Sequence, residues 1–204
     1  MANESPRVAA IVLAAGKSAR MGSNKLLADL GGAPLIRQTV EAVMSWSLER
    51  TIVVTGHEAD KIAEALHGLD IASVHNADYA LGLAASLRRG LEALPKNVDA
   101  ALICLSDVPL IEAGTARKLI AAFATPQTIC VPVYKGTRGN PVLWGRAHFP
   151  AMMKLTGDRG AKELMDQFPE NLVEIETSDE GILLDADTPE ALVRLRTLFC
   201  PRPA

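Results

Sequence analysis

The alternation of short apolar runs with helix-like segments constrains the fold of this chain more than any other feature of its sequence. Apolar runs of strand length occupy residues 8–13, 51–55, 100–105 and 128–133, and a helix with one apolar face is expected to begin near Pro34. Strands separated by helices and short loops indicate βαβ units. The sequence therefore predicts an α/β fold with a Rossmann-like, doubly wound, mostly parallel sheet that carries helices on both faces.

The composition agrees with this arrangement. Hydrophobic residues make up 49% of the 204 residues, whereas aromatic residues make up only 4%. The core must therefore be built from Ala, Val, Leu and Ile, which suits helices packed on a buried parallel sheet. A chain of this length has no need for a second core, so we expect residues 1–204 to form a single domain.

Charge and cysteine content argue against several classes of protein. The formal net charge is −3, and no block of Lys or Arg suggests a groove for nucleic acid or a patch for an anionic membrane. The three cysteines lack paired spacing, which suits a reducing compartment. The apolar run at residues 8–15 has strand length, and no segment approaches the roughly 20 apolar residues that span a bilayer. We expect a cytoplasmic protein with no nucleic-acid or membrane partner.

The segment LAAGKSARMGSNK, which begins at Leu13 where the first strand ends, has the composition of a phosphate-binding loop. Small residues let backbone amides approach a ligand closely, and successive amides form a concave nest for phosphate oxygens. Arg20 and Lys25 could neutralise a triphosphate, with Lys25 placed to stabilise charge on the α-phosphate. The glycine spacing fits neither a Walker A loop nor a dinucleotide fingerprint. A tight turn with solvated cations remains the alternative.

Aspartates follow two later strand-like segments. Asp107 stands just beyond residues 100–105, where a carboxylate is expensive to desolvate unless it is paired, capping or metal-bound. It is well placed to hold Mg²⁺ against triphosphate oxygens, although a turn aspartate is also common before proline. Asp185 and Asp187 alternate in an extended segment and so share one side, where one of them could complete the metal site. The alternative is that these residues only cap a helix that begins at Pro189.

Three further segments are rich in small residues. The turn that includes Asn76 and residues 81–86 could approach a base or ribose. From Tyr134 to Gly160 glycines cluster, and this region, with its two glycine-bearing stretches at 136–141 and 156–161, is expected to form an irregular insertion over the edge of the sheet. Loops of this kind are more often functional than accidental, and Arg138 with nearby amides could receive a second, anionic substrate.

Taken together, these segments resemble the MobA-like nucleotidyltransferases and, within them, the molybdenum cofactor cytidylyltransferases. The similarity covers nearly the whole chain. The motifs that carry it are LAAGKSARMGSNKLL at 13–27, NADYALGLAASLRRGL at 76–91, LSDVP at 105–109, KGTRGNPVLW at 135–144, LTGDRGAKEL at 155–164 and LLDADTPEAL at 183–192. Their order along the chain is far more specific than any one of them.

The resemblance implies a Rossmann-like nucleotidyltransferase that moves a nucleoside monophosphate from a nucleoside triphosphate to the phosphate of molybdopterin. It implies Mg²⁺ held by Asp107, with Asp185 or Asp187 assisting. The residues implied to bind the nucleotide are Leu13, Ala14, Ala15, Gly16, Arg20, Lys25, Asn76, Gly82 and Ser86. The residues implied to be catalytic are Lys25, Asp107 and Arg20. The residues implied to face the pterin substrate are Arg138, Gly139, Asn140, Gly157, Asp158 and Gly160.

The base is inferred from a single methyl group. Family members that use GTP resemble L-A-G-G at this loop, whereas this chain has Ala15 before Gly16. The methyl should crowd a purine and suit a pyrimidine, which points to CTP, although one methyl is worth only about 1–3 kcal/mol of discrimination.

Several alternatives stay open. The enzyme could use GTP, or transfer to phospholactate, a sugar phosphate or methylerythritol phosphate. A protein of another class, a carrier that hands molybdenum cofactor to a client molybdenum hydroxylase, is a further hypothesis. Asp107→Ala separates the classes, because a carrier should keep binding and delivery while an Mg²⁺ enzyme should lose turnover.

Overall fold

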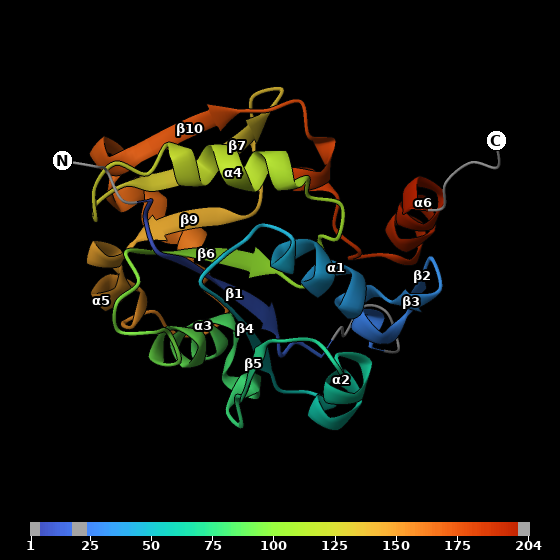
Figure 1. The fold of residues 1–204 in the computed structure, drawn as a ribbon. Helices are drawn as coiled ribbons and strands as arrows, with labels where there is room; N and C mark the ends of the chain where they lie inside the picture. The colour runs from blue at the N-terminus through green and yellow to red at the C-terminus, as the bar shows by residue number, and fades with distance from the viewer. Residues whose placement is uncertain (1–4, 18–23, 200–204) are drawn as a thin grey trace.

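The strands of a computed structural model, which describes residues 5–17 and 24–199, form one main sheet and one small hairpin (Figure 1). The order across the main sheet is β10-β7-β9-β6-β1-β4-β5, and β8 pairs with the carboxyl end of β7. These strands are β1 (Val8–Ala14), β4 (Arg50–Thr55), β5 (Ala72–His75), β6 (Ala100–Leu105), β7 (Ile129–Tyr134), β8 (Thr137–Arg138), β9 (Val142–Gly145) and β10 (Leu172–Glu176). The hairpin pairs β2 (Asp29–Leu30) with β3 (Ala33–Pro34).

Most pairings in the main sheet are parallel, which confirms the predicted α/β fold. The exceptions are β9, which runs antiparallel to both β6 and β7 and separates them, and the short β8, which pairs antiparallel with β7. The prediction that the glycine-bearing stretch lies over the edge of the sheet is therefore wrong for this strand. All four residues of β9 are buried. Because buried backbone N–H and C=O groups need hydrogen-bond partners, the segment is more stable with a strand on each side than at an exposed edge.

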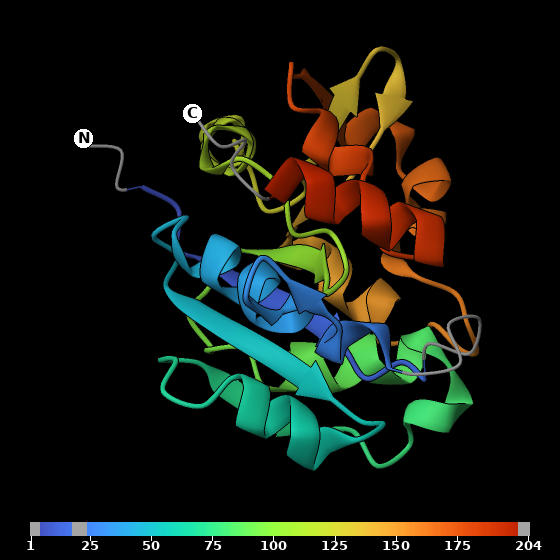
Figure 2. The same cartoon turned by 90° about the vertical axis from the view of Figure 1, so that its right-hand side faces the viewer.

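Helices cover both faces of the sheet (Figures 1 and 2). The helices are α1 (Leu35–Met44), α2 (Ala59–Ala65), α3 (Leu83–Glu92), α4 (Ala113–Ala121), α5 (Phe149–Met152) and α6 (Pro189–Phe199). Short 3-10 turns are η1 (Lys25–Leu27), η2 (Tyr79–Leu81), η3 (Arg146–His148), η4 (Ala161–Gln167), η5 (Pro169–Asn171) and η6 (Glu180–Leu183). The helix predicted to start near Pro34 begins at the next residue.

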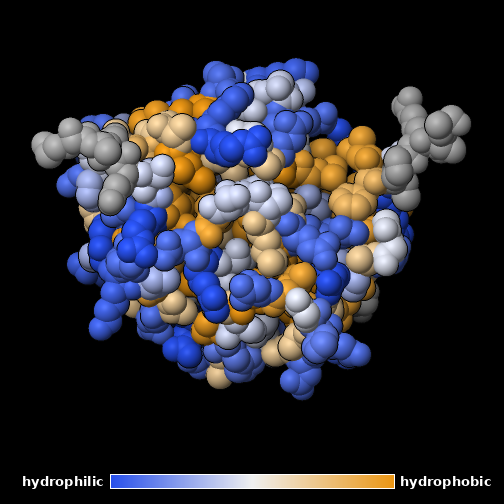
Figure 3. All heavy atoms as spheres, in the orientation of Figure 1, coloured by the Kyte–Doolittle hydropathy of each residue, from blue (hydrophilic) through white to orange (hydrophobic). Residues whose placement is uncertain are grey.

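Residues of β1 divide between two hydrophobic clusters, one on each side of the sheet. Val12 packs with residues of α1, α4 and α6, whereas Ile11 and Leu13 pack with α3, α5 and η4. This division follows from the two-residue period of a strand, and both faces are apolar because both are covered. On the surface, hydrophilic side chains surround smaller hydrophobic areas (Figure 3). Among the described residues no helix is long and apolar enough to cross a membrane.

Candidate active site

The carboxyl ends of β1 and β6 meet at one edge of the sheet. The strands are parallel neighbours, and Leu13 is paired in register with Leu105. A cavity of about 490 Å³ opens here, in the position where doubly wound sheets bind ligands. Its lining residues are Leu13, Ala15, Gly16, Lys17, Lys25, Leu26, Tyr79, Ala80, Gly82, Leu83, Ser86, Leu105, Ser106, Asp107, Asp158, Asp185 and Asp187. We call it the nucleotide cavity below.

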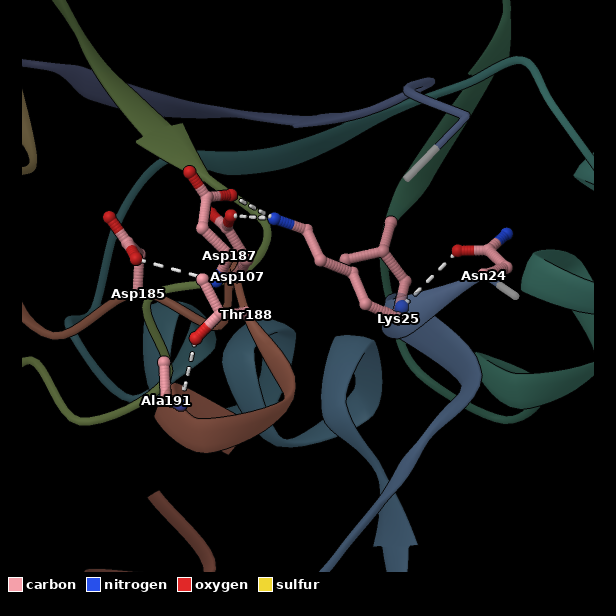
Figure 4. A network of polar contacts seen from close by, with 8 residues as sticks. Asn24, Lys25, Asp107, Asp185, Asp187, Thr188 and Ala191 are labelled. Atoms are coloured by element: carbon pink, nitrogen blue, oxygen red, sulfur yellow. Dashed lines mark hydrogen bonds and ion pairs between the residues drawn. The ribbon is translucent and has the colours of Figure 1, made fainter. Parts of the chain in front are cut away.

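Lys25 stands at the centre of the charged end of this cavity (Figure 4). Its Nζ lies 2.5 Å from Oδ2 of Asp107 and 2.5 Å from Oδ1 of Asp187. The side chains of Lys25 and Asp107 are each 13% exposed, and that of Asp187 is 48% exposed. Burial by itself would lower the pKa of the Lys25 ammonium, but the charge and hydrogen bond of Asp107, assisted by Asp187, outweigh burial and raise this pKa.

Local capping positions these three side chains. Asn24 precedes η1, and its Oδ1 accepts a hydrogen bond from the backbone N–H of Leu26 at 3.2 Å. The segment that carries Asp187 is tied to β6 because Ala186 donates its N–H to the carbonyl of Asp107. Thr188 Oγ1 accepts from the N–H of Ala191, so this threonine, and neither aspartate, caps the first turn of α6 (Figure 4). The carboxylate of Asp187 is therefore left to face Lys25.

Asp185 lines the same cavity. Its pKa is raised by desolvation and then by repulsion from Asp187 and Asp107. Its Oδ1 accepts from the N–H of Asp187 at 3.4 Å. Within the described ranges, no group of three or more His, Cys, Asp or Glu side chains is arranged to hold a metal ion. The predicted set of three carboxylates is thus realised as a pair that shares the Lys25 ammonium, with Asp185 beside it.

The paired carboxylates nevertheless suit Mg²⁺ chemically. Both oxygens lie 2.5 Å from the Lys25 Nζ, and Mg²⁺ binds oxygen at about 2.0–2.1 Å. Mg²⁺ sites commonly use one or two carboxylates together with substrate phosphates. A divalent ion would therefore occupy nearly the position that the ammonium holds, so Asp107 and Asp187 fit the ion once Lys25 moves aside.

The other end of the nucleotide cavity is built from small residues. The carbonyl of Ala15 accepts the backbone N–H of His57, which fixes the loop after β1. Ser86 lines the cavity, while the buried Asn76 donates to Ser86 Oγ at 3.1 Å and therefore positions it from behind. Ala14 is also buried in β1 and does not line the cavity. Of the predicted nucleotide-binding set, Arg20 lies outside the described residues.

The turn at Gly82 joins the two halves of the site. Its φ of 103° is open only to glycine, and a Cβ at this position would lie 2.4 Å from the backbone of Gly157. The carbonyl of Gly157 also accepts the N–H of Ala84 at 3.0 Å. The loop from the second glycine-bearing stretch therefore packs directly on the start of α3, beside Asp158, which lines the nucleotide cavity.

The residues predicted to face the second substrate separate into two groups. Arg138 Nε donates a hydrogen bond to Oε1 of Glu174, a residue of β10, at 2.6 Å, and Gly139 packs against Ile182. Neither Arg138 nor Gly139 lines the nucleotide cavity or the smaller cavity next to it. Asn140 and Gly160 line a second cavity of about 200 Å³. This cavity is also lined by Lys162, which lies in the motif at 155–164 but was not predicted as a site residue.

Comparison with known proteins shows the family of the chain. Residues 10–172 match the model of the MobA-like NTP transferase domain. The chain is 31% identical over 196 residues to the purine catabolism protein PucB of Bacillus subtilis, covering 91% of this chain and 94% of that protein. It is 36% identical over 169 residues to the bifunctional protein GlmU of Kineococcus radiotolerans, covering 80% of this chain. The match covers 33% of that GlmU, so the chain corresponds to about a third of its length.

Solved structures with the same architecture include a nucleotidyl transferase from Methanothermobacter thermautotroptrophicus, with a TM-score of 0.83 and 30% identity over 94% of this chain and 97% of that one. A manganese complex of Rv0371c from Mycobacterium tuberculosis has a TM-score of 0.78 and 25% identity, covering 94% and 98% of the two chains. Fold and site thus define a nucleotidyltransferase. The chain belongs to the MobA-like NTP transferase domain family.

Proposed function

We propose that this protein transfers CMP from CTP to the phosphate monoester of molybdopterin, forming the cytosine dinucleotide cofactor and pyrophosphate with the help of Mg²⁺. The observation that carries the proposal is Lys25 held between Asp107 and Asp187 in a cavity whose other end is built from small residues. The choice of CTP rests on Ala15, which lines this cavity and whose methyl should crowd a purine more than a pyrimidine.

The reaction needs positioning more than covalent chemistry. An oxygen of the acceptor phosphate forms a bond to the α-phosphorus, the bond from that phosphorus to the β-bridging oxygen breaks, and pyrophosphate leaves with the electron pair. The acceptor is already an anion, so no activated Ser, Cys or His is required. Lys25 would turn from the carboxylates to the phosphates and stabilise charge on the transferring group. Mg²⁺, when bound at Asp107 and Asp187, supplies neutralisation of triphosphate charge.

The relatives support a divalent ion and a triphosphate more strongly than they support an acceptor. The manganese complex of Rv0371c favours a metal in this family. Another phosphate acceptor, such as a sugar phosphate, is a second candidate. GTP in place of CTP and a non-catalytic carrier are the remaining alternatives.

The test incubates the purified protein with each of the four nucleoside triphosphates and molybdenum cofactor, and follows pyrophosphate. We expect release with CTP that requires both Mg²⁺ and the cofactor. Asp107→Asn should reduce it by about 10²–10³-fold, because a charge used in the transition state is lost. Asp70→Asn is the matched control, since Asp70 is 91% exposed and pairs only loosely with Arg50 at 3.8 Å. Release with GTP alone refutes the choice of base, and full activity of Asp107→Asn refutes the catalytic role.

A further inference from the structure

Asp179 is a buried carboxylate that the transfer reaction does not use. It follows β10, which points in the same direction as β6, because β10 is parallel to β7 and both β6 and β7 are antiparallel to β9. The residue therefore lies at the edge of the sheet where the nucleotide cavity opens. It is 3% exposed, and no other Asp or Glu of the described residues is buried. Burying a carboxylate is expensive unless it is hydrogen-bonded, so its partners show which parts of the chain it holds.

The Asp179 carboxylate holds the start of α4. Its Oδ2 accepts the backbone N–H of Glu112 at 2.9 Å and the hydroxyl of Thr115 at 2.7 Å. Because an ionised carboxylate only accepts, Thr115 is the donor in this contact and in turn accepts from Thr177 Oγ1 at 3.3 Å. Glu112 comes five residues after Asp107, so Asp179 fixes the far end of the loop that carries this first carboxylate.

The same side chain caps η6, the turn that leads to the second carboxylate of the site, Asp187. Asp179 Oδ1 accepts the backbone N–H of Gly181 at 2.9 Å. At the other end of this short segment, Ala186 donates its N–H to the carbonyl of Asp107. The segment before Asp187 is therefore anchored at both of its ends to the loop after β6.

Two cross-links thus join the loop after β6 to the segment after β10. One is the bond between Ala186 and Asp107 beside the nucleotide cavity, and the other is the Asp179 carboxylate at the start of α4. Between them the two backbones touch, since a Cβ at Gly181 would lie 2.2 Å from the carbonyl oxygen of Leu110. A change at one cross-link should therefore be transmitted to the other.

We propose that Asp179 is a positioning residue that sets the separation of the Asp107 and Asp187 carboxylates, and hence their fit to a divalent ion. Asp107 directly follows the buried strand β6, so Asp187 is the carboxylate that shifts when the second cross-link is lost. Such a shift matters because Mg²⁺ demands near-ideal geometry from its oxygen ligands. The inference rests on the metal site of the proposed function, and it does not depend on the choice of CTP or of the acceptor.

The test replaces Asp179 by Asn and titrates Mn²⁺ into nucleotide-free protein, following the electron paramagnetic resonance signal of the free ion. Asn keeps the shape of Asp, but in either orientation its NH₂ group faces an N–H donor, that of Gly181 or that of Glu112. We expect Mn²⁺ to bind about 10- to 100-fold more weakly, as when a residue that orients a metal ligand is lost.

Two controls separate positioning from stability. Leu119→Ala empties a fully buried position of the same helix α4, so it should lower the free energy of unfolding and leave Mn²⁺ affinity within about twofold of native. Thr115→Val removes one donor from the Asp179 carboxylate and should weaken Mn²⁺ binding about 3- to 10-fold. Thr39→Val removes a buried hydroxyl from α1 and should have no such effect. If Asp179→Asn fails to fold, the two threonine variants decide the result.

Two further measurements report on positioning itself. In metal-free Asp179→Asn, the amide of Ala186 should exchange its hydrogen about tenfold faster than in the native protein, while that of Leu192, bonded to Thr188 in α6, should stay protected. In the Asp187→Asn protein, which lacks the carboxylate through which Asp179 acts, Asp179→Asn should change Mn²⁺ affinity by less than about twofold.

The outcomes separate this inference from the proposed function. Weaker Mn²⁺ binding in Asp179→Asn and Thr115→Val, without pyrophosphate release from any nucleotide, supports the positioning role and refutes the transfer reaction. Pyrophosphate release from CTP, together with native Mn²⁺ affinity in Asp179→Asn, overturns the positioning role and leaves the transfer reaction in place. Equal weakening by Asp179→Asn in the native and Asp187→Asn proteins also overturns the positioning role, as does a native protein that binds no Mn²⁺.

Discussion

Replacing Lys25 by Met should tighten the binding of a divalent metal ion in the absence of nucleotide. The ammonium lies 2.5 Å from an oxygen of each of Asp107 and Asp187, nearly where a metal would lie. In the native protein a metal ion must displace this ammonium, which then loses its contacts with both carboxylates. Met is close to Lys in length and removes the charge, so Lys25→Met vacates the position with little change in packing.

The magnitude follows from the exposure of each contact. A hydrogen bond between charged groups contributes about 1.5–3 kcal/mol when it is shielded, as at Asp107, which is 13% exposed. The contact with Asp187, 48% exposed, contributes about 0–1 kcal/mol after screening by solvent. Displacement therefore costs roughly 1.5–4 kcal/mol. Even the shielded contact alone, at about 1.5 kcal/mol, corresponds to roughly a tenfold gain in metal affinity.

The assay titrates Mn²⁺ into nucleotide-free protein and follows the electron paramagnetic resonance signal of the free ion. Lys17→Met is the control, because Lys17 lines the same cavity with its Nζ over the Tyr79 ring at 5.5 Å from the centroid. It removes the same charge from the cavity but no contact with a carboxylate, so its Mn²⁺ affinity should stay within about threefold of the native value. Mn²⁺ binding by Lys25→Met that is no tighter than native would refute the idea that Lys25 holds the metal position.

Three other changes test the fold and its turns. Gly82→Ala forces a Cβ to within 2.4 Å of Gly157 at a φ of 103°, so we expect the free energy of unfolding to fall by roughly 2–4 kcal/mol in chemical denaturation and nucleotide binding to weaken. Gly114→Ala, whose Cβ would meet nothing closer than 3.9 Å, should be neutral or stabilising. Equal effects of the two substitutions would contradict the role given to the Gly82 turn. Burial raises the pKa of the Cys130 thiol from 9.0 to about 11, so the thiol of the unfolded chain loses its proton first as the pH rises. The free energy of unfolding should therefore fall between those pH values, by at most about 2–3 kcal/mol, and Cys130→Ala should lack this fall when the two proteins are compared from pH 8 to 11. Parallel pH profiles of the two proteins would show that the thiol is not responsible. Leu102→Ala empties a fully buried position in β6 and should cost about 2–5 kcal/mol in the same denaturation assay, whereas a loss below 1 kcal/mol would mean that the two faces of this strand are loosely packed.

The part of the fold that the sequence predicts is the part governed by local pattern. Residues 100–105 were expected as a strand and form β6, because a fully buried parallel strand is a continuous apolar run. The position of β9 was not predictable, since its partners β6 and β7 lie at other points of the chain and its four residues follow a glycine-bearing loop. Strand order depends on such distant pairings, which a local pattern does not contain.

The candidate site divides in the same way. Asp107 and Lys25 were selectable because each follows a strand end and carries a charge that needs a partner. That Arg138 would bind Glu174 was not visible, because the partner lies 36 residues away on an edge strand.

Lys25 also determines how metal and nucleotide should depend on each other. In the free protein its ammonium compensates the charge of the mostly buried Asp107 carboxylate, which lies close to that of Asp187. A metal ion alone would take the place of the ammonium and remove its contact with Asp107, and a triphosphate alone would draw the ammonium away from the mostly buried Asp107 carboxylate. When both enter together, every charge has a partner. The two ligands should therefore bind with positive coupling, which thermodynamics makes reciprocal, and Lys25→Met should remove most of it.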